Sequence, residues 1–322
     1  MNIAVLSGWH VHAVGYAKEA AAMPGVQITA AWDELPERGE AWAKELGCPF
    51  VADYETILAD PTIDGVMICA PTNRHAEIMI RAAEAGKHIF TEKVLTLSDA
   101  DADAVAAAVH KNNIHFTISF PHRTRPELLA AKKLAYDGTL GTLTYARVRN
   151  VHSGSIKDWL PPHFYSEEQC GGGAMFDLGA HPMYTLLWLL GKPKQAASIF
   201  TNVTDRPVED NAVSVIAFEN GAIGVSETGF VSACDPYVLE ISGTKGYVRV
   251  CDGIQYRLDG QQGWITPNLP EKLCSPLAYW IESVQKDYPN MLYTIDEAVA
   301  LTRLMSAAYA SARGNVIADV QP

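Results

Sequence analysis

Hydrophobic residues in the first third of the chain form short continuous runs that alternate with longer amphipathic or alanine-rich segments. The runs have the length of strands and few polar interruptions, which is typical of parallel strands buried on both faces. The segments between them are about ten residues long and have helical spacing, so the alternation predicts βαβ units. The expected strands are 2–6, 26–32, 65–70, 88–90 and 114–118, and the expected helices are 13–23, 37–46, 74–85 and 99–109.

The rest of the chain has a different pattern. Its hydrophobic runs are short, often alternate with polar residues, and are separated by turn residues such as Asn220-Gly221 and Asp259-Gly260. This pattern favours half-buried strands joined by hairpins. We expect a helix at 126–136, a strand at 143–150, further strands between 197 and 267, and closing helices at 277–287 and 295–312.

Residues 170–190 open with three glycines, which would let a ligand approach the backbone closely. Hydrophobic positions from Phe176 to Leu190 then recur at intervals of three, four and seven, which predicts a buried helix. Asp177 and His181 are four residues apart and would share one face of it. Burying a carboxylate and an imidazole costs free energy unless they have partners or a task. Two interpretations stay open, a structural hydrogen bond and a general acid/base pair.

Composition narrows the class of protein. The chain has 322 residues, of which 48% are hydrophobic and 19% charged, so we expect a globular protein of two domains. Its net charge of -12 argues against a nucleic-acid binder and against attachment to anionic membranes. Six cysteines without paired spacing suggest reduced thiols, and neither a signal peptide nor a membrane span is expected. A cytoplasmic protein is therefore predicted.

The first expected strand ends in a turn that could receive a dinucleotide. Parallel sheets bind ligands beyond the C-terminal ends of their strands. Of the G-x-G-x-x-G fingerprint the turn keeps Gly8, whereas Leu6 and Val11 occupy the other glycine positions. Asp33 ends the second strand, where a carboxylate accepts from a ribose 2′-OH and repels a 2′-phosphate, which favours NAD over NADP. Alternatively, Asp33 only caps the next helix. Because Arg38 is nearby, NADP also stays possible as the cofactor.

His10 and His12 lie in the same turn. Two histidines at this spacing could begin a metal site, but a zinc site needs three or four ligands. No carboxylate or cysteine accompanies them at metal-ligand spacing. We therefore expect no metal, and favour solvated histidines or contacts to the cofactor.

The strand expected at 88–90 continues into Glu92 and Lys93. A lysine at the C-terminal end of a buried parallel strand points into the ligand crevice. There it could hydrogen-bond a substrate hydroxyl, or burial could lower its pKa. A surface lysine is the alternative interpretation.

Together these motifs resemble the Gfo/Idh/MocA oxidoreductases. The resemblance rests on A-x-x-G-K-H-x-x-x-E-K ending at Lys93, on Asp33, and on G-G-G-x-x-x-D-x-G-x-H ending at His181. One departure is Val94, where the family has proline. The resemblance implies an α/β fold, with an N-terminal Rossmann domain over 1–120. It also implies a substrate-binding and oligomerisation domain over 121–322, built on a large open, mostly antiparallel sheet.

The resemblance also implies hydride transfer between NAD and a sugar, inositol or related polyol. The broad sheet expected in the second domain would leave one face uncovered, so we expect a homodimer or homotetramer in which a partner subunit covers it. His181 would be the general acid/base, Asp177 would orient it, and Lys93 would polarise the reacting oxygen. The cofactor would contact Ser7, Gly8, Trp9, His10, Asp33, Pro71, Thr72, Asn73, His75, Glu92 and Lys93. The substrate would contact Arg123 and, in the loop 151–169, Lys157, Trp159 and His163, although that loop could also be plain surface.

Two other functions stay open. One is an NAD-assisted lyase or glycosidase, in which the hydride returns to the substrate. The other is a regulatory protein that binds a dinucleotide or sugar without turnover, an interpretation motivated by the incomplete glycine turn and by Val94.

Overall fold

The computed structural model describes residues 1–234 and 237–322, which form two compact units. The first unit comprises Met1–Phe120 and Cys274–Val299, and the second comprises Pro121–Leu273 and Ala300–Pro322. The sequence analysis placed everything after residue 120 in one domain. Residues 274–299 belong instead to the first unit, because helix α10 (Pro276–Lys286) buries Leu277, Trp280 and Ile281 in the core of that unit.

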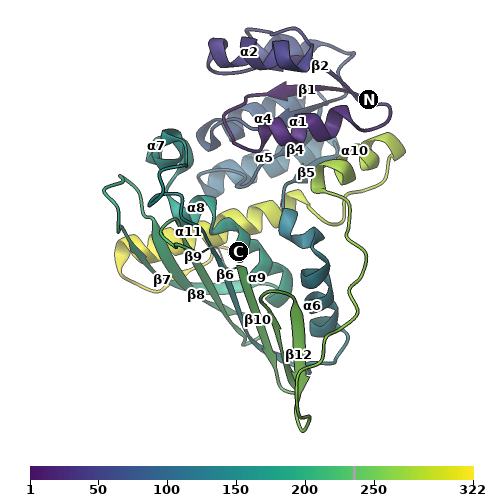
Figure 1. Cartoon of the computed structure of the whole chain (residues 1–322). Coiled ribbons are helices and arrows are strands. Elements are labelled where there is room, and N and C mark those ends of the chain that lie inside the picture. The colour runs from purple at the N-terminus through teal and green to yellow at the C-terminus, as the bar shows by residue number, and fades with distance from the viewer. Residues whose placement is uncertain (235–236) are drawn as a thin grey trace. The chain divides into compact units, whose positions relative to one another are not determined.

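The first unit is built on a five-stranded parallel sheet of order β2-β1-β3-β4-β5 (Figure 1). Nearly every strand residue is buried, as the continuous hydrophobic runs predict. The strands are β1 (Asn2–Leu6), β2 (Gln27–Trp32), β3 (Gly65–Ile68), β4 (His88–Thr91) and β5 (Phe116–Ile118). The helices are α1 (Ala13–Ala21), α2 (Pro36–Leu46), α3 (Tyr54–Ala59), η1 (Thr72–Arg74), α4 (His75–Glu84), α5 (Asp99–Asn112) and α10. Helix α3 was not expected.

The second unit contains an eight-stranded sheet of order β12-β11-β10-β6-β9-β8-β7-β13. All neighbouring strands are antiparallel except β6 and β9, so the predicted large, mostly antiparallel sheet is confirmed. The strands are β6 (Leu143–Val151), β7 (Pro193–Thr201), β8 (Asn211–Phe218), β9 (Ile223–Gly229), β10 (Tyr237–Gly243), β11 (Gly246–Val250), β12 (Ile254–Leu258) and β13 (Ala318–Asp319). Residues 263–267, expected as a strand, make only an isolated bridge between Tyr256 and Ile265.

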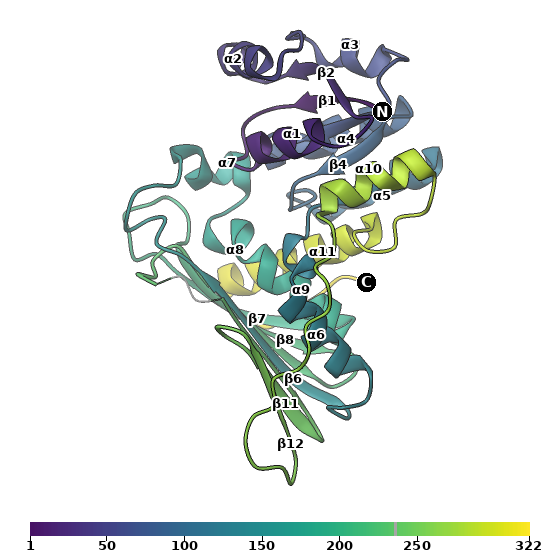
Figure 2. The ribbon, with the colours of Figure 1, turned by 45° about the vertical axis from the view of Figure 1, so that its right-hand side comes forward.

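Helices cover one face of this sheet. Figure 2 shows α6, α8 and α9 on the same side, where α6 contacts β10, β11 and β12, and α8 and α9 contact the central strands. Their bounds are α6 (Pro126–Tyr136), α7 (Glu167–Cys170), α8 (Ala174–Asp177) and α9 (Ala180–Leu190), and α11 (Ile295–Gly314) runs from the first unit into the second. Two short 3₁₀ helices, η2 (Pro121–Thr124) and η3 (Pro162–Tyr165), complete the unit. Among the described residues, no helix has the length and hydrophobicity to cross a membrane.

Candidate active site

The turn after β1 is organised by hydrogen bonds to its own side chains and to Asp33. Ser7 has a left-handed backbone with a φ of 73°, a conformation that glycine more often adopts. The Ser7 hydroxyl accepts from the Trp9 amide at 3.1 Å, and the Gly8 amide donates to Asp33 Oδ2 at 2.8 Å. The predicted turn residues therefore lie together at the C-terminal edge of the sheet.

Asp33 is fully engaged by the chain itself. The side chain is only 2% exposed, and it accepts from the amides of Gly8 and Leu35, each at 2.8 Å. Arg38 adds two bonds, from Nε at 2.8 Å and from Nη2 at 2.7 Å. A carboxylate offers about four acceptor positions, so these four donors use its capacity. Asp33 thus braces the turn and the start of α2, and keeps a negative charge at the end of β2.

The segment after β3 is held by His75. Pro71, Thr72 and Asn73 lead through η1 into α4, whose first residue is His75. The buried His75 ring lies 3.0 Å from the Ala70 carbonyl oxygen through Nε2, and 3.0 Å from the Val94 carbonyl oxygen through Nδ1. Burial lowers the pKa of His75, although its backbone hydrogen bonds oppose that effect. His75 therefore joins the loop after β3 to the loop after β4, and both ring nitrogens face the protein backbone.

Glu92 and Lys93 follow β4 and are almost completely buried. Glu92 Oε1 lies 2.8 Å from His12 Nδ1 and 4.0 Å from His10 Nδ1, and it accepts from the Tyr16 hydroxyl. Glu92 Oε2 accepts from the Lys93 amide at 2.9 Å. Burial alone would raise the pKa of Glu92, but the positive charges available on His10, His12 and Lys93 hold it well below the usual value. The peptide bond between Lys93 and Val94 is cis.

Tyr16 is a site residue that the sequence analysis missed. Its hydroxyl lies 2.8 Å from Ser119 Oγ, at the end of β5, besides donating to Glu92. Burial raises the pKa of Tyr16 well above its usual value, and the nearby Glu92 charge adds to this effect. The phenol therefore stays protonated and links α1 to the ends of β4 and β5. Only its place within α1 was predictable, because its partners are 76 and 103 residues away.

In the second unit, the predicted helix that carries Asp177 and His181 is divided. Helix α8 ends at Asp177 and α9 begins at Ala180. Pro182 has no backbone N–H to donate to the Leu178 carbonyl, so it is tolerated only in the first turn of a new helix. Asp177 is half-buried at the end of α8, whereas His181 is 7% exposed in the first turn of α9.

The glycines before α8 make room for protein atoms rather than for a ligand. Gly171 ends α7 with a φ of 82°. A Cβ on Gly172 would lie 2.0 Å from the Tyr309 hydroxyl, and a Cβ on Gly173 would lie 2.0 Å from the Glu209 carbonyl oxygen. Glu209 Oε1 in turn accepts from the Gly173 amide at 2.9 Å and from Tyr309 at 2.5 Å. The sequence analysis expected these glycines to let a ligand approach, and this expectation is wrong. The glycines instead allow close packing against protein atoms, which fixes the start of α8.

His181 lies among aromatic rings. Its Nδ1 is 3.0 Å from the Tyr184 hydroxyl, and its ring stacks on His122 with the ring centres 4.4 Å apart and an angle of 16°. The His122 ring meets Tyr237 edge-on at 4.8 Å. The sequence analysis did not include Tyr184 or His122 in the site. Tyr184 carried a signal, because it lies three residues after His181 and therefore on the same helix face.

The predicted substrate residues divide into two groups. Arg123 is 5% exposed, and its guanidinium lies 5.7 Å from the ring centres of both Tyr184 and Trp188, so it packs against α9. Lys157, Trp159 and His163 belong to the segment between β6 and α7. Trp159 is 52% exposed with its ring 4.7 Å from that of His152, Lys157 is exposed, and His163 lies beside Phe164. A substrate role for these four residues stays a prediction.

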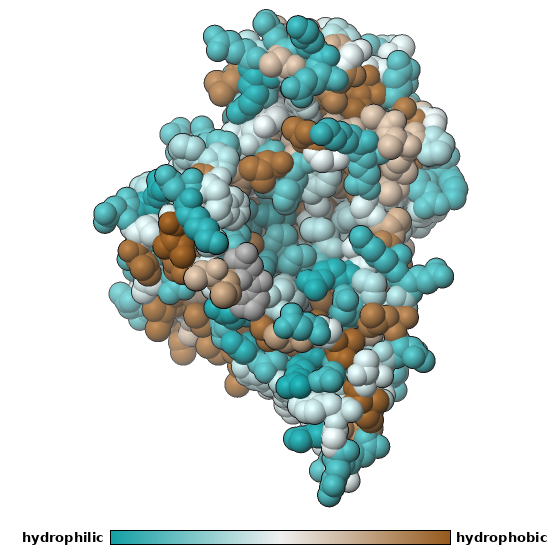
Figure 3. All heavy atoms as spheres, in the orientation of Figure 1, coloured by the Kyte–Doolittle hydropathy of each residue, from teal (hydrophilic) through white to brown (hydrophobic). Residues whose placement is uncertain are grey.

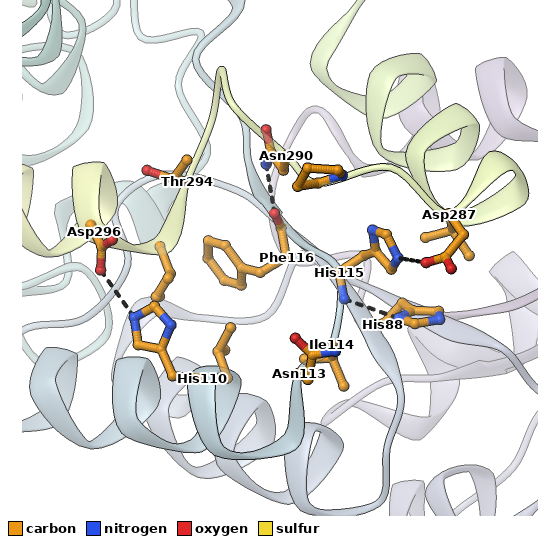
Figure 4. Close-up of a pocket in the computed structure, with 14 residues that line it drawn as sticks. His88, His110, Asn113, Ile114, His115, Phe116, Asp287, Asn290, Thr294 and Asp296 are labelled. Carbon is orange, nitrogen blue, oxygen red and sulfur yellow. Dashed lines mark hydrogen bonds and ion pairs between the residues drawn. The ribbon is translucent and has the colours of Figure 1, made fainter.

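A separate pocket of about 630 Å³ opens in the first unit at the start of β4 and β5. Figure 4 shows that His110 and His115 point toward acidic residues of the 287–296 segment. His110 Nε2 lies 3.0 Å from Asp296, and His115 Nε2 lies 3.2 Å from Asp287. These two ion pairs therefore join residues 287–296 to α5 and to the start of β5. They lie at the edge of the sheet opposite to the edge that carries Ser7 and Lys93.

The sequence matches family descriptions in both units. Residues 10–120 match "Oxidoreductase family, NAD-binding Rossmann fold", and residues 128–249 match "GFO/IDH/MocA C-terminal domain". With a parallel-sheet domain and an antiparallel-sheet domain, the chain belongs to the Gfo/Idh/MocA family of oxidoreductases, as the resemblance predicted. Its N-terminal domain is an NAD-binding Rossmann domain.

Two relatives of known name are about 30% identical to the chain over the aligned region. The chain is 31% identical to the scyllo-inositol 2-dehydrogenase (NAD(+)) of Bacillus subtilis (strain 168), over 70% of this chain and 66% of that protein. It is 30% identical to the inositol 2-dehydrogenase of Rhizobium meliloti (strain 1021), over 72% of this chain and 70% of that protein. The crystal structure of GenD2 from gentamicin A biosynthesis in complex with NAD has a TM-score of 0.86 at 25% identity, covering 100% of this chain and 97% of that one. The match thus spans just under two thirds of the B. subtilis enzyme.

Proposed function

We propose that the protein is an NAD-dependent dehydrogenase that oxidises a hydroxyl group of a sugar, inositol or related polyol. The observation that carries the proposal is the placement of two family motifs. Lys93 follows β4 at the ligand-binding edge of the Rossmann sheet, and His181 lies in the first turn of α9. Both side chains are buried among polar or aromatic partners, and two inositol dehydrogenases are among the relatives.

In this proposal a bound nicotinamide would supply the hydride chemistry, and the residues of the protein handle the proton. His181 takes the proton from the reacting hydroxyl, because imidazole exchanges protons near neutral pH. The Tyr184 hydroxyl, which lies beside Nδ1 of His181, helps to fix the orientation of the His181 ring. Lys93 donates a hydrogen bond to the same oxygen and stabilises its developing negative charge. Asp177 orients His181 or binds an adjacent hydroxyl.

A panel of sugars and inositols with NAD or NADP, followed by NADH absorbance, tests this function. A polyol that gives sustained NADH formation supports it. Product formation without net NADH would favour the lyase or glycosidase alternative, in which the hydride returns. Dinucleotide or sugar binding without any turnover over the whole panel would favour the regulatory alternative. We also propose a cytoplasmic location, supported by the six free cysteines.

The cofactor preference provides the first prediction. NADH should bind at least about tenfold more tightly than NADPH, a difference of about 1.4 kcal/mol, because the Asp33 charge repels a 2′-phosphate. Asp33→Ala should narrow the gap, since it removes that charge and releases Arg38 to contact the phosphate. Fluorescence titration with both cofactors measures the effect.

The matched control is Glu34→Ala. Glu34 also accepts from Arg38, at 2.5 Å, but it lies two residues beyond the end of β2, one further than Asp33. We expect Glu34→Ala to change the preference for NADH over NADPH less than Asp33→Ala does. Tighter binding of NADPH by the unmutated protein would contradict the prediction.

We further propose that the uncovered face of the second sheet forms a homodimer or homotetramer contact. On that face Ile199 pairs with Val213, and Val215 with Val225, while Ile223 lies at the far end of the same row. Ile199 is 74% exposed, and Figure 3 shows hydrophobic side chains gathered over β7 and β8 at the lower left. An exposed hydrophobic patch of this kind marks an interaction surface, and a second copy of the chain would cover it.

Light scattering tests the assembly. The unmutated protein should have at least twice the 35.0 kDa mass of one chain at micromolar concentration. Ile199→Glu should lower the mass toward that of one chain, because it places a charge in the patch at its most exposed hydrophobic residue. Leu269→Glu, at an exposed position outside the sheet, is the control and should leave the mass unchanged. A monomeric unmutated protein would rule out the contact.

A further inference from the structure

Three metal-ligating side chains meet in the first unit at the turn after β1. His10, His12 and Glu92 each offer one ligand atom, and these atoms all lie within 4.8 Å of one another. Glu92 Oε1 is 2.8 Å from His12 Nδ1 and 4.0 Å from His10 Nδ1. The sequence analysis expected no metal because no carboxylate accompanies the two histidines along the chain. The fold supplies Glu92, the residue after β4, 80 residues beyond His12.

The distances within the cluster are close to those of a metal site. Ligand atoms that share one tetrahedral zinc ion, with bonds of about 2.0–2.2 Å, lie about 3.3–3.6 Å from one another. Glu92 Oε1 is 2.8 Å from His12 Nδ1 and 4.0 Å from His10 Nδ1, so small shifts of the two rings bring both distances into this range. The His12 amide donates to His10 Nδ1 at 3.2 Å, and an ion bound at that nitrogen takes the place of this hydrogen bond.

The carboxylate of the cluster is already held in place. The Lys93 amide fixes Glu92 Oε2, and Tyr16, itself bonded to Ser119, donates to Oε1. Such outer contacts orient a metal ligand and lower the cost of assembling a site. The His12 side chain is 47% exposed, whereas that of Glu92 is 2% exposed, so an ion can reach the cluster from solvent past His12.

We propose that His10, His12 and Glu92 bind a divalent transition-metal ion, with Zn²⁺ the best match. Two imidazoles and one carboxylate suit zinc and its neighbours in the first transition row, whereas Mg²⁺ and Ca²⁺ prefer oxygen ligands alone. The ion takes the place of the proton shared by His12 and Glu92, and that proton leaves to solvent. Three protein ligands leave one zinc position open for water or another small ligand.

Calorimetric titration of the cofactor-free full chain with Zn²⁺ tests the site. The exposed cysteines Cys234, Cys251 and Cys274 are alkylated first, because thiolates also bind zinc. We expect one Zn²⁺ per chain with a Kd of about 10 µM or tighter. Co²⁺ provides a second reading, because ligation by two imidazoles and a carboxylate produces visible absorption bands at the same stoichiometry.

Substitutions of the proposed ligands test whether Zn²⁺ binds at this cluster. His12→Gln should weaken Zn²⁺ at least about tenfold, and Glu92→Gln should do the same. His110→Gln is the matched control, because His110 is also half-exposed and lies 3.0 Å from a single carboxylate, that of Asp296. It should leave the Kd unchanged. If Glu92→Gln unfolds, as thermal melting would show, the exposed His12 variant decides the outcome.

Either of two results would overturn the site: no saturable binding near one ion per chain, or binding that His12→Gln leaves unchanged. The titration contains neither dinucleotide nor polyol. Its failure would therefore leave the proposed dehydrogenase untouched, and a failure of the substrate panel would leave the metal site untouched.

Discussion

His181→Ala is expected to lower kcat by roughly 10²–10⁴-fold, the usual contribution of a general acid/base. The substitution removes the imidazole, and with it the group that takes the proton from the reacting hydroxyl. NADH affinity should change little, because the residue serves the substrate. Steady-state kinetics with the polyol identified from the panel, together with NADH titration, measure both effects.

Two companion variants sharpen this result. Asp177→Asn should be milder if Asp177 only orients His181, and a loss equal to that of His181→Ala would give Asp177 a direct role. His115→Ala removes a histidine of the first unit that pairs with Asp287, and it should leave kcat near the unmutated value. A loss of less than about tenfold in His181→Ala would contradict the proposed acid/base role.

Lys93→Met is expected to lower kcat by about 10²-fold or more, with NADH affinity within about twofold of the unmutated protein. Removal of one preorganised donor to a developing oxyanion commonly costs about 10²–10³ in kcat. Methionine keeps much of the apolar stem of lysine, so the burial of the side chain is preserved while its charge is lost. Single-turnover hydride transfer and NADH titration separate the two quantities.

The control is Lys111→Met, which removes an equal charge from the exposed end of α5. It should change neither kcat nor NADH affinity. A parallel loss of NADH binding and kcat in Lys93→Met would show that the lysine serves the dinucleotide. The lysine would then have no separate role at the reacting oxygen.

Most strands of both sheets are predictable from the sequence, because the two sheets bury their strands differently. In β3 all four residues are buried, which produces a continuous hydrophobic run, whereas β8 alternates exposed and buried positions. The six-residue α3 was missed because it is short and its main local signal is the cap that Asp53 provides. The division between α8 and α9 could have been expected from Pro182, whose ring excludes a continuous helix.

The candidate site residues that lie at the ends of strands were predictable from the sequence. Asp33 stands directly after β2 and Lys93 two residues after β4, and topology brings all such positions to one edge of a parallel sheet. The contacts of Glu92 with Tyr16 and His12 were not predictable, since they join residues 76 and 80 positions apart. The stacking of His122 on His181 likewise depends on the packing of η2 against α9, for which the sequence carries no periodic signal.

The return of residues 274–299 to the first unit affects the order in which this chain can fold during its synthesis. Trp280 is fully buried against Phe90, and the absent side chain of Gly65 leaves space for its ring. A nascent chain that has emerged only to residue 120 lacks this tryptophan, and its sheet is exposed where α10 belongs. Domains usually fold as units while the ribosome proceeds. Here the N-terminal domain cannot complete its core until nearly the whole protein has been translated. The second unit must wait as well, because it includes residues 300–322.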